Sequence, residues 1–286
     1  MSPELFAQSL VNGVGLALVY ALVALGLTLI FSIMGIINFA HGEFFMLGGF
    51  IAYYLYGAYG VNYLVTLLLA MGIVGGLGAL AERWLFAPIR ENAMSGFVAS
   101  LGLLWVLQSL ATLAFGALDK AVPSPFPGVV RRFGVILSFE RLVVIVCSAG
   151  LIAALYLFIQ YTRYGLALRA VAQDGRAAAF QGINVDGMST LAFGIGTALA
   201  GVAGVLLAPV FFVSPFMGSL PVVKAFIIII LGGMGSLSGA VLGGFVLGLF
   251  ESVAPIFVPM AAVDILSFLV VMLVLVVRPR GLLGRA

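Results

Sequence analysis

The stretch LFAQSLVNGVGLALVYALVALGLTLIFSIMGIINFAHG, residues 5–42, contains no charged side chain and a single histidine, His41. As one straight helix it would be on the order of 57 Å long at 1.5 Å per residue. A bilayer core of about 30 Å needs only about 20 residues. The stretch therefore predicts one membrane span at residues 10–31, a break at 35–42, and a second apolar helix at 43–56.

Further uncharged stretches follow along the chain. Hydrophobic residues make up 64% of the 286 residues and charged residues only 8%, whereas a soluble domain carries roughly 25% charged residues. Soluble, disordered and disulfide-rich classes are thereby excluded. We expect an all-α polytopic membrane protein with about eight membrane segments, some broken or re-entrant, in one transmembrane domain over residues 1–286. The further uncharged stretches are residues 44–81, 92–118, 142–162, 187–223, 225–250 and 265–277.

The few reactive side chains exclude most enzyme classes. Cys147 is the only cysteine, so no intrachain disulfide can form, and His41 is the only histidine, so no site with two histidine ligands can form. Lys120 and Lys224 are the only lysines, and each precedes alanine, whereas a P-loop needs serine or threonine there. If ATP is involved, another subunit binds it. We expect no catalytic residue, no metal site and no cofactor bound by this chain.

Positive charges predict the orientation of the chain, because Lys and Arg concentrate on the cytoplasmic side of a membrane. The net charge of +3 is therefore interpreted as orientation rather than nucleic-acid binding. The proline-containing loop 119–141 is expected to be periplasmic, ordered and not helical, and the loop 163–186 to be cytoplasmic. For the C-terminus to be cytoplasmic, residues 222–250 must contribute either no crossing or two. The arginines assigned to the cytoplasm are Arg83, Arg90, Arg163, Arg169, Arg176, Arg278, Arg280 and Arg285.

Two glycine-containing breaks are candidates for a membrane pathway, because interrupted helices are tolerated where they line a cavity. In NFAHGEFFMLGG, residues 38–49, His41 and Glu43 form either a polar turn at the membrane surface or a helix start beside a pathway. In LGGMGSLSG, residues 231–239, a broken helix or a hairpin is expected near mid-membrane. Two series of glycines spaced by four predict close helix packing or an open backbone beside the pathway: Gly235, Gly239 and Gly243, and Gly244 and Gly248. Three single charges are expected at the membrane interface: Lys224, Glu251 and Asp264.

The stretch RYGLALRAVAQDGRAAAFQGINV, residues 163–185, is the longest polar stretch with helical character between two spans. Its alanines favour helix, and Gly175 and Gly182 divide it. One or two short helices at the cytoplasmic surface are expected. They form either an ordinary connector or a helix with small side chains that docks in the groove of a soluble partner.

The motifs NFAHGEFFMLGG, LRAVAQDGRAAAFQGINV and LGGMGSLSGAVLGG match, in order and spacing, those of LivH-type permease subunits. Over essentially its whole length the chain resembles this family, which belongs to bacterial high-affinity branched-chain amino-acid ABC importers. The resemblance implies a multi-pass permease of the bacterial inner membrane that moves Leu, Ile or Val into the cytoplasm. It further implies a second, LivM-like permease, two cytoplasmic ATPases that bind ATP-Mg, and a periplasmic binding protein.

The resemblance also assigns roles to positions in this sequence. The loop 163–186 corresponds to the segment that couples the permease to the ATPases, and the two glycine-containing breaks are expected to line the pathway. The coupling positions are Arg169, Ala170, Gln173, Asp174, Ala178, Gly182, Ile183 and Asn184. The pathway positions are Asn38, His41, Glu43, Gly232, Gly233, Gly235, Ser236 and Gly239.

Other functions remain open from the sequence. A permease for urea or another small amide would carry similar motifs. A stand-alone carrier or channel would need an ionisable residue inside the membrane, for which Glu43 and Glu251 are the candidates. The number of crossings, the side of the N-terminus and the pairing with a copy or with a different permease stay open as well.

Overall fold

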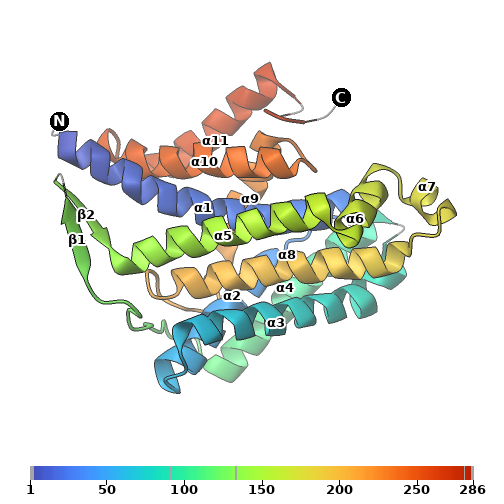
Figure 1. Cartoon of the computed structure of the whole chain (residues 1–286), viewed down its shortest axis with the longest axis horizontal. Helices are drawn as coiled ribbons and strands as arrows, with labels where there is room; N and C mark the ends of the chain where they lie inside the picture. Colours follow the sequence, from blue (N-terminus) through green and yellow to red (C-terminus); the bar gives the residue numbers. More distant parts are fainter. Residues whose placement is uncertain (1–2, 91, 133, 280, 285–286) are drawn as a thin grey trace.

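The computed structural model describes residues 3–90, 92–132, 134–279 and 281–284, and within them the chain forms a helical bundle with one small β-hairpin (Figure 1). Seven helices are long and apolar enough to cross a membrane, and an eighth apolar helix is shorter, which confirms the predicted class. The seven are α1 (Pro3–Met34), α3 (Tyr63–Ala81), α4 (Ala93–Phe115), α5 (Phe139–Tyr161), α8 (Val185–Leu207), α10 (Leu237–Val253) and α11 (Met260–Val277).

Short π-helical or 3-10 turns follow some of these α-helices. After α3 the chain continues through a π-helical turn, η2 (Glu82–Phe86), and a 3-10 turn, η3 (Ala87–Ile89). After α10 comes a second 3-10 turn, η4 (Ala254–Ile256). Prolines lie within both 3-10 turns and prevent the helices from continuing regularly.

The long uncharged N-terminal stretch divides after Met34, as its length predicts. Gly35 has φ +65°, a conformation that favours glycine, and α1 ends there. Residues 35–40 are not helical, and α2 (His41–Ile51) follows with a π-helical extension, η1 (Ala52–Ala58). The His41 ring lies 3.1 Å from the carbonyl oxygen of Val23, in the middle third of α1. The second helix therefore begins inside the bundle.

A second interrupted segment lies between α8 and α10. Residues 208–218 are irregular, and α9 (Ser219–Gly232) has only 14 residues. The backbones of Gly218 and Gly42 touch, so the N-termini of α9 and α2 meet inside the bundle. The turn that joins α9 to α10 lies instead near Ser32, at the end of α1. The break at residues 232–239 is thus not near mid-membrane as expected, because α9 runs from the bundle interior to that end before the chain reverses.

Helices α1 and α8 form the centre of the bundle. In their most apolar windows 78% and 72% of the residues are buried, against 17% for α4 and α11, which lie outside. Small residues let the central backbones approach closely: Gly26 of α1 meets Gly196 of α8. Gly244 and Gly248 of α10 pack on Ala21 and Ala17 of α1, which confirms the packing interpretation for this pair.

The described residues of 119–138 are not helical, as predicted for the loop 119–141, but α5 already begins at Phe139, and the loop contains strands that were not predicted. Strand β1 (Val129–Arg132) pairs antiparallel with β2 (Val135–Ser138). The hairpin is held to α1 by Gln8, whose Oε1 accepts from the Ile136 N–H at 2.7 Å and whose Nε2 donates to the Ile136 carbonyl at 2.9 Å.

The two ends of the bundle differ in what they carry. The N-terminus and the β1–β2 hairpin lie at one end, while α6 (Arg163–Gln173), α7 (Gly175–Phe180) and the C-terminal segment lie toward the other (Figure 1). This arrangement is consistent with the predicted placement of loops 119–141 and 163–186 on opposite sides of a membrane. Of the arginines used for that prediction, Arg280 and Arg285 lie outside the described residues.

Candidate functional site

The loop between α5 and α8 folds as two short helices, within the predicted range of one or two. Thr162 caps α6, since its Oγ1 accepts from the Gly165 N–H at 2.9 Å. Arg169 of α6 reaches back to α5, where its guanidinium donates to the side chain and the carbonyl of Gln160 at 3.3 and 3.4 Å. The predicted coupling residue Arg169 therefore anchors α6 to the end of a membrane helix.

Several other predicted coupling residues shape the turns of this loop. Asp174 caps α7 by accepting from the backbone N–H groups of Arg176 and Ala177 at 2.9 and 3.0 Å. Gly182 has φ +80° and ends α7, and Asn184 caps α8 by accepting from the Gly187 N–H at 2.9 Å. Capping of this kind satisfies N–H groups that the helix itself leaves free. These hydrogen bonds thus hold the loop in one defined conformation.

The remaining coupling positions divide between buried and exposed. Ala178 is buried, and its carbonyl accepts from the Ile183 N–H at 3.1 Å, so these two residues close the turn after α7. The carbonyl of Ala170 accepts from the Asp174 N–H at 3.1 Å, while the Gln173 side chain is exposed.

Phe180, at the end of α7, is the residue of this loop that sequence reasoning did not single out. Its side chain is 90% exposed, although a phenylalanine usually buries its ring. It follows three alanines at the end of the six-residue helix α7, of which only Ala178 is buried, and an aromatic residue after a run of alanines was the signal available in the sequence. An exposed aromatic ring on a fixed loop is a typical anchor for a protein partner.

A charged cluster links the end of this loop to α3. Arg90 lies 3.1 Å from Asp186 and 3.5 Å from the fully buried Glu82, and it donates to the Ser189 hydroxyl at 3.0 Å. The hydroxyl of Thr190 donates to Glu82 at 2.5 Å. The first residues of α8 are therefore joined to the C-terminal extension of α3, a connection that the sequence did not reveal.

The polar residues at the start of α2 are all buried. His41 Nε2 donates to the Val23 carbonyl, Asn38 Oδ1 accepts from the Ala40 N–H at 3.1 Å, and Glu43 Oε1 accepts from Gln108 Nε2 at 3.0 Å. The interpretation as a polar turn at the membrane surface is wrong, because this turn packs against the middle of α1.

The glycines expected in the second break have different positions. The backbones of Gly232 and Gly239 touch where α9 crosses α10, so this pair packs helices together. Gly233 and Gly235 have φ +105° and +80° and form the turn, and Ser236 caps α10 by accepting from the Gly239 N–H at 3.1 Å. The structure thus places the predicted pathway residues in two groups, one inside the bundle and one at its end.

Three charges that were expected singly at the interface form one cluster. Lys224 Nζ lies 2.5 Å from Glu251 Oε1 and 2.7 Å from Asp264 Oδ1, which joins α9, α10 and α11. Tyr20 donates to Glu251 Oε2 at 2.8 Å, and Ser267 donates to Glu251 Oε1 at 3.2 Å. The expectation of separate interfacial charges is wrong, since the helix crossings bring residues from three elements together.

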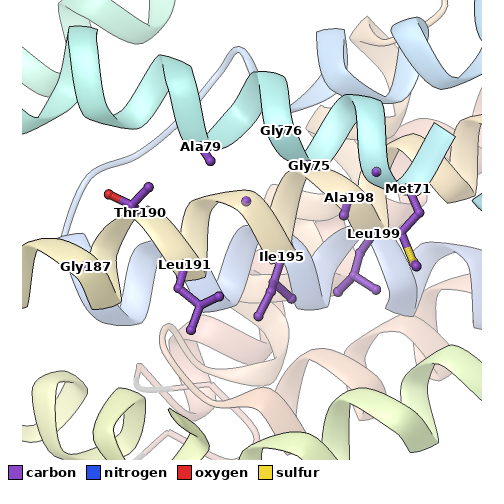
Figure 2. A pocket seen from close by; sticks show the side chains of 12 residues that line it. Met71, Gly75, Gly76, Ala79, Gly187, Thr190, Leu191, Ile195, Ala198 and Leu199 are labelled. Carbon is purple, nitrogen blue, oxygen red and sulfur yellow. The ribbon is translucent and has the colours of Figure 1, made fainter. Parts of the chain in front are cut away.

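A groove of about 580 Å³ runs between α3 and α8 (Figure 2). Figure 2 shows Ala79 and Thr190 lying between the two helices. None of its lining residues is charged, so the groove has the character of a helix-packing surface. The lining residues are Met71, Gly72, Gly75, Gly76, Ala79, Gly187, Thr190, Leu191, Gly194, Ile195, Ala198 and Leu199. Within the described residues, no group of three or more His, Cys, Asp or Glu is placed to hold a metal ion.

Comparison with known proteins gives one consistent result. The family model described as "Branched-chain amino acid transport system / permease component" matches residues 9–276. The high-affinity branched-chain amino acid transport system permease protein LivH of Escherichia coli K12 is 37% identical over 295 residues, covering 98% of this chain and 96% of the relative. BraD of Pseudomonas aeruginosa, described in the same words, is 35% identical over 300 residues, covering 99% and 98%. No solved structure is significantly similar.

Proposed function

The chain belongs to the family of permease components of branched-chain amino acid transport systems, and from this membership we propose that it moves leucine, isoleucine and valine into the cytoplasm. A permease of an ABC system works with an ATPase and a binding protein. The proposed assembly contains two cytoplasmic ATPases, a LivM-like second permease and a periplasmic binding protein. ATP-Mg binds to the ATPases. This chain changes conformation in response to ATP hydrolysis on those subunits and does not catalyse it.

The observation that carries the proposal is the capped α6–α7 loop with its exposed Phe180. Asp174 and Asn184 fix the turns on both sides of α7, and Phe180 is held in solvent. A partner that binds this loop does not need to order it first, which lowers the entropic cost of docking. A groove on the ATPase is the proposed receptor for the Phe180 ring.

Arg90 gives the docked loop a second connection to the bundle. The loop leads directly into α8, and Arg90 joins the first turn of α8 to Glu82 after α3. Movement of the ATPases would therefore displace α8 and α3 together. Such a rigid displacement is a physical means to bias the bundle between inward- and outward-facing packing.

The proposed pathway follows the two interrupted segments, which meet at Gly42 and Gly218. Irregular backbone inside a membrane is tolerated where it is buried in protein or lines a water-filled cavity. Beside this meeting point Asn38 Nδ2, His41 Nδ1 and Glu43 Oε2 have no partner among the described residues. These buried atoms would gain partners if the bundle opened to water or to a polar substrate, and the turn at Gly233 and Gly235 lies at the other end of α9.

Reconstitution of the complete assembly tests this function. The chain, tagged at its C-terminus, is purified from gently solubilised native membranes, and co-purifying proteins are identified by mass spectrometry. The complex is then placed in proteoliposomes with ATP inside and the binding protein outside, and uptake of radiolabelled leucine, valine and urea is measured. We expect leucine and valine uptake that stops when the ATPase cannot hydrolyse ATP.

Two results would contradict the proposal. ATP-driven uptake of urea without uptake of leucine or valine would assign the chain to small amides. Uptake by the chain alone, driven by a sodium or proton gradient, would make it a secondary carrier, and the α6–α7 loop would then be an ordinary connector.

A further inference from the structure

The Lys224–Glu251–Asp264 cluster lies deep along the bundle axis. Gly248, one turn before Glu251 on α10, packs on Ala17, near the middle of the 32-residue helix α1. Tyr20, which donates to Glu251, is also in the middle third of α1. A helix of this length measures about 48 Å, so its middle third lies well within a hydrocarbon core of about 30 Å.

The cluster contains one more carboxylate than it has cations. Lys224 and Glu251 form a buried pair, with side chains 8% and 7% exposed, but the Asp264 side chain is 60% exposed. A carboxylate that faces lipid at this depth is strongly unfavourable, whereas one that faces water or a cation is not. The surface around Asp264 therefore faces an aqueous space or a positively charged group.

The exposed face of α9 connects this carboxylate to an aromatic wall. Leu220 is 69% exposed and Val223, one turn later, is also exposed, whereas the neighbouring Lys224 is buried and extends to Glu251 and Asp264. One turn beyond Val223, the Phe226 ring lies 4.7 Å from the ring of Phe39, between centroids. Phe39 belongs to the irregular segment before α2. At 3.6 residues per turn, Lys224 and Phe226 lie on opposite flanks of Val223, so the exposed strip of α9 at Val223 runs between a charged side and an aromatic side.

We propose that this face of α9 is a binding station for a zwitterionic amino acid with a branched aliphatic side chain. The α-ammonium group binds the exposed Asp264 carboxylate. Lys224 has three N–H donors, two of which go to Glu251 and Asp264, so the third is available to the α-carboxylate. The aliphatic side chain packs against Val223, Phe226 and Phe39. The inference rests on the proposed function and names the residues that recognise the substrate.

Protection of an introduced cysteine tests the station. In a Cys147→Ala background, Val223→Cys and Leu220→Cys are made separately, and each complex, with its second permease and ATPases, is placed in lipid nanodiscs. A water-soluble thiol reagent is expected to label both cysteines, and leucine at millimolar concentration to slow labelling at least fivefold. Met272→Cys, on the exposed surface of α11, is the matched control and is expected to remain unlabelled because lipid covers it.

Two comparisons identify the group that is recognised. The leucine analogue 4-methylpentanoate has the same carbon skeleton without the ammonium group and is expected to give no protection. Asp264→Asn is nearly isosteric and leaves Lys224 paired with Glu251, so the complex is expected to assemble, while protection by leucine is lost and leucine uptake falls at least tenfold. Asp264→Glu keeps the charge and is expected to restore most of the protection.

The proposal is overturned if both α9 cysteines are labelled at the same rate with and without leucine. It is also overturned if neither is labelled in the complex and Asp264→Asn releases the second permease, because a basic side chain of that subunit would then occupy the site. Leucine uptake by the Cys147→Ala complex, measured in parallel with the binding protein, separates these outcomes from failure of the proposed function. Intact uptake together with unprotected cysteines rejects only the binding station.

Discussion

Single side chains determine the shape of the loop between α5 and α8. Asp174 and Asn184 each accept backbone N–H groups at the start of a helix, and Gly182 takes a positive φ between them. These residues lie at positions that the family resemblance assigned to coupling, and their visible role is to hold the loop in one conformation. The side chain that this conformation presents to a partner is Phe180.

Phe180→Ala is expected to reduce ATP-driven leucine uptake by about tenfold without lowering the amount of folded protein. The ring is 90% exposed, so its removal leaves no cavity in the bundle, but an aromatic anchor at a docking site is typically worth 1–3 kcal/mol or more of binding. Uptake and co-purification of the ATPase are measured together. Gln181→Ala, the exposed neighbour, serves as control, and equal effects of the two substitutions would exclude a specific docking role for the ring.

Arg90→Met is expected to destabilise the chain by about 3 kcal/mol, because it leaves the fully buried Glu82 carboxylate without its cation. The stability is measured as the Tm of the purified chain in detergent. Asp186→Asn is the contrasting variant, with an expected effect of at most about 1 kcal/mol, because that side chain is 83% exposed.

The double variant Glu82→Gln with Arg90→Met checks the cause of this loss. It removes the buried charge together with its partner and is expected to recover part of the lost Tm. A double variant less stable than Arg90→Met alone would mean that the unpaired charge is not the source of the instability.

At the scale of elements, the helices with a clear apolar pattern could be predicted from the sequence. The third span was predicted at residues 63–81 and is observed as Tyr63–Ala81. That the N-terminal stretch must break followed from its length, and the break predicted at residues 35–42 is observed at residues 35–40. The β1–β2 hairpin could not be predicted, because its eight residues lie in a proline-containing loop and one strand is also bound by the distant residue Gln8 of α1.

Close helix crossings are expected to tolerate no added methyl group. Gly248→Ala would place Cβ against the Ala17 backbone and is expected to cost about 1–3 kcal/mol through overpacking of α10 on α1. The yield of monodisperse protein and its Tm measure this cost. Gly102→Ala in α4, where no atom lies within 4 Å of the added group, is the control and should be neutral or slightly stabilising, because alanine favours helix.

At the scale of the whole molecule, the placement of the candidate sites depends on contacts between distant segments. Gly42 meets Gly218, and Lys224 meets Glu251 and Asp264, across separations that no local pattern encodes. The sequence indicated the breaks at residues 35–42 and 232–239 and the charged residues, but not the irregular residues 208–218 that precede α9. Their assembly into a meeting point and a cluster follows from how α1, α8 and α10 pack, which is a property of the complete bundle.

The predicted orientation is testable on intact cells. In a Cys147→Ala background, Leu118→Cys, in the loop between α4 and β1, is expected to react with a membrane-impermeant thiol reagent added outside, because this loop is assigned to the periplasm. Ala179→Cys on α7 should react only after the cells are permeabilised. Both side chains are exposed, so a lack of reaction would not result from burial. The reverse pattern would invert the assigned topology.

The central position of α1 has a consequence for biosynthesis. Its main partners, α8 and α10, are translated much later, and about 220 residues separate the end of α1 from the end of α10. At about 5–20 residues per second, ribosomes need roughly 10–40 s to make that interval. During this time Ala17, Ala21 and Gly26 face lipid or an insertion factor instead of their final neighbours. The most buried helix, α1, therefore spends the longest time in the bilayer before its packing partners are synthesised.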